Sequence, residues 1–150
     1  MEILFFRIAN RIAAIETGNI QEVLHNKDTI PFLPISRYVK KMVVNRGKVI
    51  GVIDLGTLFS LPDKPRSLQE YILMSCSGIS FCLATKKILV VRRLSKKFIK
   101  PAVSGLFIPE KFIGNVCVIG QKTYPILSEK KILEYPDIKV LWSKENSVEL

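Results

Sequence analysis

Short apolar runs, separated by turn residues, follow one another along the 150-residue chain. Runs of about four to eight residues that are rich in Ile, Val, Leu and Phe are typical of β-strands. We expect strands at residues 3–8, 12–15, 20–24, 42–44, 49–53, 71–75, 79–84, 88–91, 112–118, 123–126 and 140–142. Many short strands between regular turn signals predict an all-β barrel or sandwich.

Turns and short helices fill the gaps between these runs. Turn residues predict hairpins at residues 45–47, 77–78 and 120–122, and short helices are expected at 36–41, 55–61 and 128–133. The first of these helices would place Tyr38 and Val39 inward. Gly51 lies inside an apolar run, which predicts a bulge or a close approach by another backbone. The stretch 61–67 contains two prolines and is the best candidate for a linker between two similar halves.

The chain is strongly basic, with a formal net charge of +10. This charge predicts an acidic partner, which could be nucleic acid, an anionic membrane surface or an acidic protein face. Residues 71–109 contain no Asp or Glu, and Phe98 lies among the Lys and Arg residues of the stretch 86–100. One hypothesis is therefore a small β-barrel that binds nucleic acid through this stretch. Basic residues also exceed acidic ones in both halves of the chain, which favours a solvated basic face or docking to an acidic protein.

The sequence lacks the usual marks of enzymatic chemistry. His25 is the single histidine and follows a predicted strand, so a surface position is expected rather than that of a catalytic base. No zinc-ligand spacing, phosphate-binding glycine loop or G-x-S-x-G turn occurs. The three cysteines, Cys76, Cys82 and Cys117, are expected to be reduced and buried. We therefore expect no catalytic residue, metal, cofactor or small-molecule substrate.

The N-terminal stretch, residues 1–11, does not resemble a signal peptide, because Glu2 comes early and Arg7 interrupts the apolar run. The longest run without charge, residues 71–85, is too short and too polar to cross a bilayer as a helix. We therefore expect a cytoplasmic protein.

Three features of the first half form a recognisable motif. Residues 20–23 read Ile-Gln-Glu-Val, and Pro34 precedes the expected helix at 36–41. Residues 45–59 read NRGKVIGVIDLGTLF, in which Arg46-Gly47 leads into an aliphatic strand that ends in Asp-Leu and is followed by Phe59. This pattern resembles the CheW-like family of chemotaxis coupling proteins, and the second half follows that family's layout more loosely.

The resemblance implies a single domain, residues 1–150, made of two SH3-like five-stranded β-barrels that pack around a shared apolar core, with short helices. The first barrel would span about residues 15–67, and the second would combine about residues 1–14 with 68–150. It also implies a scaffold without enzymatic activity, which bridges the cytoplasmic tip of a chemoreceptor to a CheA-type histidine kinase. Contact with the membrane would be only indirect, through the receptor.

The resemblance also points to residues that bind the receptor. Arg46 matches the family's arginine on the receptor-facing surface, and Gly47 permits the turn that presents it. An arginine can bind a carboxylate or carbonyl groups on a receptor helix. Glu22 matches a position near the partner surface. An internal ion pair for Arg46 and a plain solvated charge for Glu22 remain open as alternatives, and no residue is assigned to the kinase.

The chain also departs from the family pattern at three positions. Val44 stands where the family usually has asparagine, Gly51 where it has proline, and Gly56 where it has arginine. Ile20 and Val44 are expected in the core. Asp54 is expected to accept hydrogen bonds from backbone N–H groups at a turn.

Overall fold

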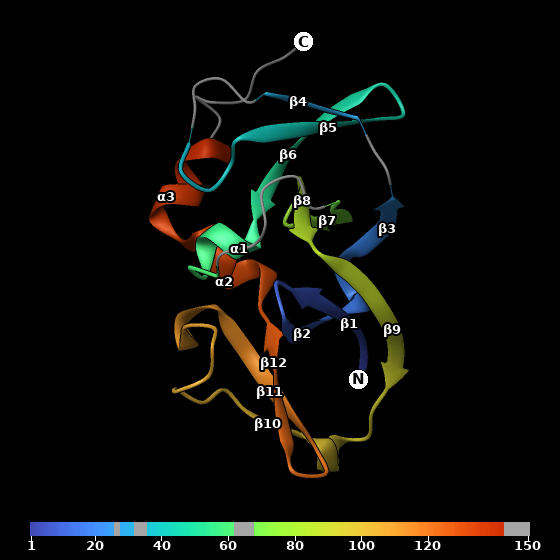
Figure 1. Cartoon of the computed structure of the whole chain (residues 1–150), viewed down its shortest axis with the longest axis vertical. Helices are drawn as coiled ribbons and strands as arrows, with labels where there is room; N and C mark the ends of the chain where they lie inside the picture. The colour runs from blue at the N-terminus through green and yellow to red at the C-terminus, as the bar shows by residue number, and fades with distance from the viewer. Residues whose placement is uncertain (26–27, 32–35, 62–67, 143–150) are drawn as a thin grey trace.

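Two curled β-sheets, joined by short helices along one side, make up the molecule (Figure 1). The computed structural model describes residues 1–25, 28–31, 36–61 and 68–142. In the view of Figure 1 the sheet of the middle of the chain lies above, and the sheet made from the two ends lies below.

The upper sheet has six strands in the order β3-β7-β8-β6-β5-β4. Its strands are β3 (Ile20–His25), β4 (Thr29–Pro31), β5 (Lys41–Asn45), β6 (Lys48–Asp54), β7 (Glu70–Cys76) and β8 (Ile79–Thr85). Neighbouring strands are antiparallel except β6 and β8, which pair in parallel. The hairpins β5–β6 and β7–β8 turn at the positions that the sequence predicts.

The lower sheet also has six strands, in the order β10-β11-β12-β2-β1-β9. They are β1 (Glu2–Ile8), β2 (Arg11–Glu16), β9 (Lys87–Arg93), β10 (Ile99–Pro101), β11 (Ile113–Ile119) and β12 (Lys122–Leu127). The parallel pair in this sheet is β12 with β2. This parallel pair joins the hairpin β1–β2, at the start of the chain, to the hairpin β11–β12.

Three apolar clusters, one inside each sheet and one between the sheets, bury many strands on both faces, and such strands have few polar residues. One cluster fills the interior of the upper sheet, with residues from β3, β5, β6, β7 and β8. A second fills the interior of the lower sheet around Ile3, Phe5 and Cys117. The largest cluster lies between the sheets and includes Leu4, Phe6, Ile72 and others. Because side chains alternate along a strand, β1 contributes Ile3 and Phe5 to one cluster and Leu4 and Phe6 to another.

Short helices cover one side of the shared core. They are α1 (Leu55–Leu58), α2 (Glu129–Glu134) and α3 (Pro136–Lys139), and 3-10 turns occur at Thr17–Asn19, Lys96–Phe98, Glu110–Phe112 and Val140–Trp142. Asp54 caps α1 by accepting a hydrogen bond from the Thr57 N–H group at 3.3 Å, and Ser128 caps α2 in the same way through Lys131. The expected role of Asp54 is confirmed.

Two of the expected elements are wrong. Residues 36–40 form no helix before β5, and only residues 37–38 form a bend, although Tyr38 and Val39 are buried as expected. The backbone N–H of Asp54 donates to the Tyr38 carbonyl at 2.9 Å, so this segment is held by β6 and needs no helical hydrogen bonds. Residues 140–142 form a 3-10 turn and not a strand. Pro34, part of the family motif, lies outside the described residues.

The expected division between the halves also differs from the strand pairing. Residues 62–67 of the linker candidate lie outside the described part of the chain. Strands β7 and β8 were expected in the second half, but they pair with β3 and β6 of the first. The chain therefore passes to the lower sheet between β8 and β9, near residue 86, and not at residue 67. Periodicity alone identifies such strands but not the sheet that they join.

Each sheet has six strands where five were expected. In the upper sheet the additional strand, β4, has three exposed residues and lies at the edge beside β5. The interior cluster takes residues from the other five strands only. The expectation of five strands thus describes the interior of the upper sheet, and β4 is an extension of its edge.

Candidate functional site

The β5–β6 turn presents Arg46 at its tip. Asn45 pairs with Lys48, which leaves Arg46 and Gly47 as the two central residues. Both have positive φ, 52° for Arg46 and 75° for Gly47, which is the signature of a type I′ turn. Glycine adopts this conformation freely, so the predicted reason for Gly47 holds. Arginine does not: a residue with a Cβ in this region costs on the order of 1 kcal/mol or more.

Glu22 on β3 reaches this turn from the opposite end of the sheet. Its Oε1 lies 3.3 Å from a guanidinium nitrogen of Arg46, and its Oε2 accepts a hydrogen bond from the Asn45 amide at 3.4 Å. Because β3 is the first strand of the sheet and β5 the fifth, these contacts close the curl of the sheet. Asn45, which is buried, was not identified from the sequence as a partner of Glu22.

The local sequence of β3 explains why Glu22 is available for this contact. Leu24 points into the interior of the upper sheet, and side chains two residues apart share a face, so Glu22 lies on that face nearer its rim. The same alternation in β5 places Asn45 on the face of Val43. A bulge between Ile20 and Glu22 interrupts the pairing of β3 with β7. Bulges commonly re-aim a side chain next to a functional site.

The ion pair leaves Arg46 open to solvent. The Arg46 side chain is 79% exposed and that of Glu22 is 33% exposed. The two alternatives for Arg46 are therefore compatible, since it forms an ion pair and also keeps N–H donors for a partner. An exposed pair of this kind adds only about 0–1 kcal/mol to stability. Glu22 is not a plain solvated charge, because it is shared between Asn45 and Arg46.

Aliphatic side chains lie on the outer face of the strands next to the turn. Val44 is 39% exposed, so its expected place in the core is wrong. Val43 takes the inward position, and the alternation of the strand sends Val44 outward. Ile30 on β4, also 39% exposed, pairs with Met42. Ile20 is partly buried against the shared core, as expected. The turn thus combines a cation, a carboxylate and a small apolar surface.

The titratable residues elsewhere have structural roles. The exposed His25 ring contacts one carboxylate oxygen of Glu70, and the other carboxylate oxygen of Glu70 accepts a hydrogen bond from the Ile88 N–H group at 2.7 Å. The surface position expected for His25 is confirmed. All three cysteines are buried and unpaired, as expected. Burial raises the pKa of the Cys82 thiol to about 12 and also raises the pKa of Cys117, so neither is a ready nucleophile.

The described part of the chain has neither a metal site nor a membrane-spanning helix. No group of three or more His, Cys, Asp or Glu residues is placed to hold a metal ion among residues 1–25, 28–31, 36–61 and 68–142. In the same ranges, no helix has the length and apolar character needed to cross a membrane.

The basic stretch 86–100 runs along β9 into β10. Two of its basic side chains have partners within the protein. Arg93 forms an ion pair with Glu2, and the Lys97 ammonium lies 5.1 Å from the centre of the Phe98 ring. Hydrogen bonds from Thr17 and Arg93 lower the pKa of the Glu2 carboxyl below its ordinary value. Phe98 is half-buried and lines a cavity. It is therefore not the open stacking platform that the nucleic-acid hypothesis requires.

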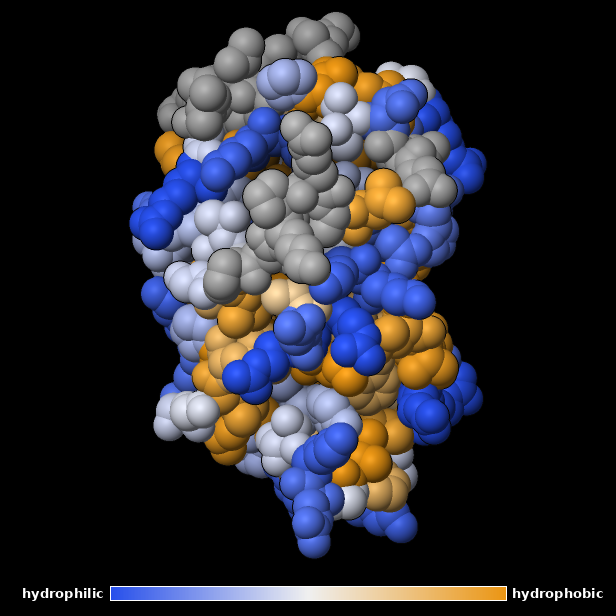
Figure 2. Space-filling model, in the orientation of Figure 1, coloured by the Kyte–Doolittle hydropathy of each residue, from blue (hydrophilic) through white to orange (hydrophobic). Residues whose placement is uncertain are grey.

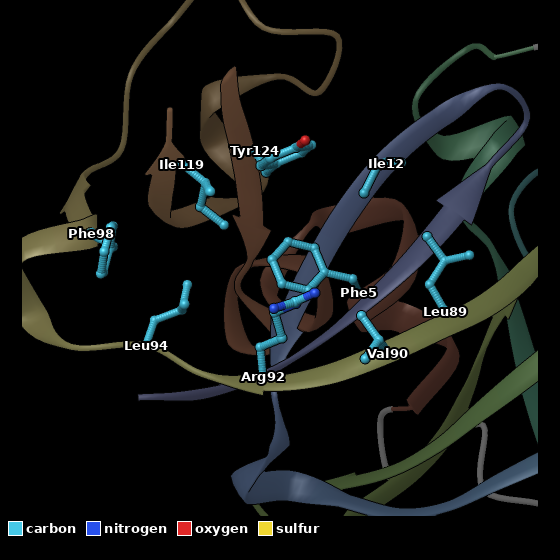
Figure 3. Close-up of a pocket in the computed structure, with 9 residues that line it drawn as sticks. All are labelled: Phe5, Ile12, Leu89, Val90, Arg92, Leu94, Phe98, Ile119 and Tyr124. Atoms are coloured by element: carbon cyan, nitrogen blue, oxygen red, sulfur yellow. The ribbon is translucent and has the colours of Figure 1, made fainter. Parts of the chain in front are cut away.

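An apolar cavity in the lower sheet was not predicted from the sequence. It measures about 480 Å³ and lies between β9 and the β11–β12 hairpin (Figure 3). Its lining includes Phe5, Val90, Leu94 and Ile119, with Arg92 beside them. The sequence signal at this place is a run of four aliphatic residues, 88–91, followed by Arg92 and Arg93, and such a run is equally typical of an ordinary strand.

Comparison with known proteins places the chain in a family. Residues 2–137 match the CheW-like domain. The chain belongs to the CheW-like domain family. The expected family is therefore confirmed.

Two relatives support this assignment. The "Chemotaxis protein CheW" of Thermotoga maritima is 25% identical over 96 residues, which cover 63% of this chain and 63% of that protein. The crystal structure of the scaffolding protein TtCheW from Thermoanaerobacter tengcongensis superposes with a TM-score of 0.81 at 19% identity, over 91% of this chain and 94% of that one. The structural match establishes the fold, and the two curled sheets are the SH3-like barrel subdomains of the family.

Proposed function

We propose that this protein is a cytoplasmic coupling protein that links the cytoplasmic tip of a chemoreceptor to a CheA-type histidine kinase. The proposal rests on the match to the CheW-like family over residues 2–137. It rests equally on the geometry of the turn at Arg46, the residue that corresponds to the family's receptor-facing arginine.

The exposed Arg46 side chain carries the proposal. Its guanidinium is held over the turn by Glu22 at 3.3 Å while 79% of the side chain remains accessible. Holding the arginine in one place lowers the entropy that a partner must remove on binding. A receptor helix could offer a carboxylate or carbonyl groups to the remaining N–H donors, with Val44 as an apolar neighbour.

The conformation of the turn places Arg46 at the tip of the hairpin. Asn or Gly would occupy the first central position of a type I′ turn with less strain than Arg. Arg46 adopts φ of 52° there. Ala9 and Ser77 adopt φ of 51° and 52° in other turns of this chain, so the argument for binding rests on the exposure and charge of the Arg46 side chain and not on the strain of its backbone.

The proposal is tested by binding of the purified protein to receptor tips and kinase. Arg46→Glu should greatly reduce co-sedimentation with a chemoreceptor cytoplasmic fragment, because it removes the donors and places two carboxylates together. Lys48→Glu is the matched control, since Lys48 is exposed in the same hairpin and pairs with Asn45 only through the backbone ladder. Equal loss in both variants would mean that only the charge of the surface matters. No loss in either would remove Arg46 from the receptor contact.

A further inference from the structure

We propose that β9 binds an extended, acidic segment of another protein as an additional strand, and that an apolar side chain of this segment enters the cavity beside β9. This surface belongs to the lower sheet, whereas the Arg46 turn belongs to the upper one. The inference therefore goes beyond the coupling function proposed above, and it stands or falls on different residues.

The position of β9 at the end of the lower sheet is the first observation. It has seven residues and pairs with β1 along one side, and among the described residues no strand pairs with its other side. Leu89, Val90 and Val91 are 36%, 44% and 51% exposed. Figure 2 shows apolar surface at the lower right of the view, where β9 runs in Figure 1, among hydrophilic side chains. An exposed apolar edge strand is a template for pairing with another chain.

The direction of the backbone groups shows what the free edge offers. The Leu94 N–H donates to the Met1 carbonyl at 2.8 Å, so at this position the backbone faces β1. Backbone groups alternate in direction along an antiparallel strand. The N–H groups of Arg92 and Val90 therefore also face β1, and those of Val91 and Arg93 face away from the sheet. An incoming strand would find its hydrogen-bonding partners at these two residues.

The cavity lies directly beside this edge. Its volume is about 480 Å³, within the usual range of pockets that bind ligands. Figure 3 shows Leu89 and Val90 of β9 on one side and Ile119 and Tyr124 of the β11–β12 hairpin across from them. A register shift between β9 and β1 at Phe5 explains why two consecutive residues of β9 line the same cavity. Side chains of a bound strand would enter between β9 and the hairpin.

Charge decides which kind of segment fits. No Asp or Glu occurs between residues 71 and 109, and the stretch 86–100 is rich in Lys and Arg. The Arg92 guanidinium makes no hydrogen bond or ion pair with any described residue, and Figure 3 shows it reaching toward Phe5 in the cavity. A partner with Asp or Glu beside its apolar side chain would pair with Arg92. Nucleic acid is disfavoured, because the free edge offers backbone groups and Phe98 is half-buried.

The test uses a fluorescein-labelled peptide of about ten residues in which Glu alternates with Val around a central Phe. Two control peptides separate the contributions. One has Lys in place of each Glu, and the other keeps every side chain but carries N-methyl groups on alternate peptide bonds, which block pairing with a strand edge. Fluorescence anisotropy with the whole protein should show saturable binding of the acidic peptide and at least about tenfold weaker binding of both controls. No saturable binding of the acidic peptide would overturn the proposal.

Two pairs of variants locate the binding. Val91→Pro removes an N–H group that faces away from β1, as an edge strand tolerates, whereas Val91→Ala keeps it. Ile119→Asp places a carboxylate at the cavity, and Val103→Asp places one at an exposed valine that does not line it. Val91→Pro and Ile119→Asp should weaken binding about tenfold or more relative to their controls, with unchanged thermal unfolding of the protein.

Other occupants give different results. If Val91→Pro and Val91→Ala bind equally, strand addition is wrong. A concentration-dependent dimer in sedimentation experiments that Val91→Pro abolishes would assign the edge to a second copy of this chain and overturn the proposal. An oligothymidine is tested in the same way. If it binds, and if Ile119→Asp weakens its binding as strongly as that of the peptide, the surface is a nucleic-acid site and the proposal is overturned.

Discussion

The indole ring of Trp142 lies against the backbone of Gly51. A Cβ atom on residue 51 would come within 2.9 Å of the ring, and the indole N–H donates to the Ser80 carbonyl at 3.3 Å. Gly51 was expected to mark a bulge or a close approach by another backbone. The pairing of β5 with β6 is regular through Gly51, and the group that comes close is a side chain from the C-terminal 3-10 turn.

We expect Gly51→Ala to displace the indole. The added methyl group cannot fit beside the ring, so the free energy of unfolding should fall by about 1 kcal/mol. Trp142 is the single tryptophan of the chain, and its emission should shift to longer wavelength as the ring becomes more exposed. Gly18→Ala is the control, because nothing lies within 4 Å of a Cβ at that position. Unchanged emission and stability in Gly51→Ala would show that the contact is not close in solution.

A charge swap separates the two roles of Arg46. If Arg46 only joins the ends of the upper sheet through Glu22, the double variant Glu22→Arg with Arg46→Glu should recover the receptor binding that Arg46→Glu loses, since the pair is restored in reverse. If Arg46 contacts the receptor, as we propose, binding should stay at least about tenfold weaker than wild type. Co-sedimentation with receptor tips measures both. Recovery to within about twofold would contradict direct contact.

Replacing Arg46 by asparagine should separate stability from binding. Asparagine tolerates the positive φ of the turn better than arginine does, and the exposed ion pair that is lost contributes about 0–1 kcal/mol. We therefore expect the free energy of unfolding of Arg46→Asn to stay within about 0.5 kcal/mol of wild type or to rise, while receptor binding falls. Chemical denaturation and the binding assay together test this. A large loss of stability would mean that the ion pair matters more than its exposure suggests.

The Cys82 thiol should make the fold less stable at high pH. Its pKa of about 12 in the folded protein exceeds the ordinary value of 9.0 because burial disfavours the thiolate. The folded state therefore holds its proton more tightly, and the stability that this provides is complete below about pH 9 and is lost as the pH rises toward 12. The slope is at most about 1.4 kcal/mol per pH unit. Denaturation midpoints between pH 8 and 11 should fall more steeply for wild type than for Cys82→Ala, and parallel curves would contradict the assignment.

Much of the fold could be predicted from the sequence, because the patterns that mark strands and the residues that cap helices are both local. Alternating apolar residues and glycine turns marked β5, β6, β7 and β8 correctly, and Asp54 and Ser128 announced the helices that they cap. The sheet that each strand joins depends on contacts between residues far apart, and no local pattern reports them. The contact of Asn45 with Glu22 and the cavity beside β9 remained hidden for the same reason.

The candidate site was only partly accessible. The resemblance of NRGKVIGVIDLGTLF to a known motif drew attention to Arg46, and Glu22 followed from the strand Ile-Gln-Glu-Val. Their ion pair across the sheet could not be inferred, because it depends on how far the sheet curls. Val44 was misplaced, since one apolar residue next to a turn can face either way and only the register of the pairing decides.

The path of the chain between the sheets has a mechanical consequence. The chain crosses from one sheet to the other twice, at residues 16–20 and at 85–87, and the apolar cluster between the sheets is drawn from both. Two tethers and a shared interior resist twisting of one half against the other far better than a single flexible hinge. A partner bound at the Arg46 turn and a partner bound along β9 would therefore keep a fixed orientation relative to each other.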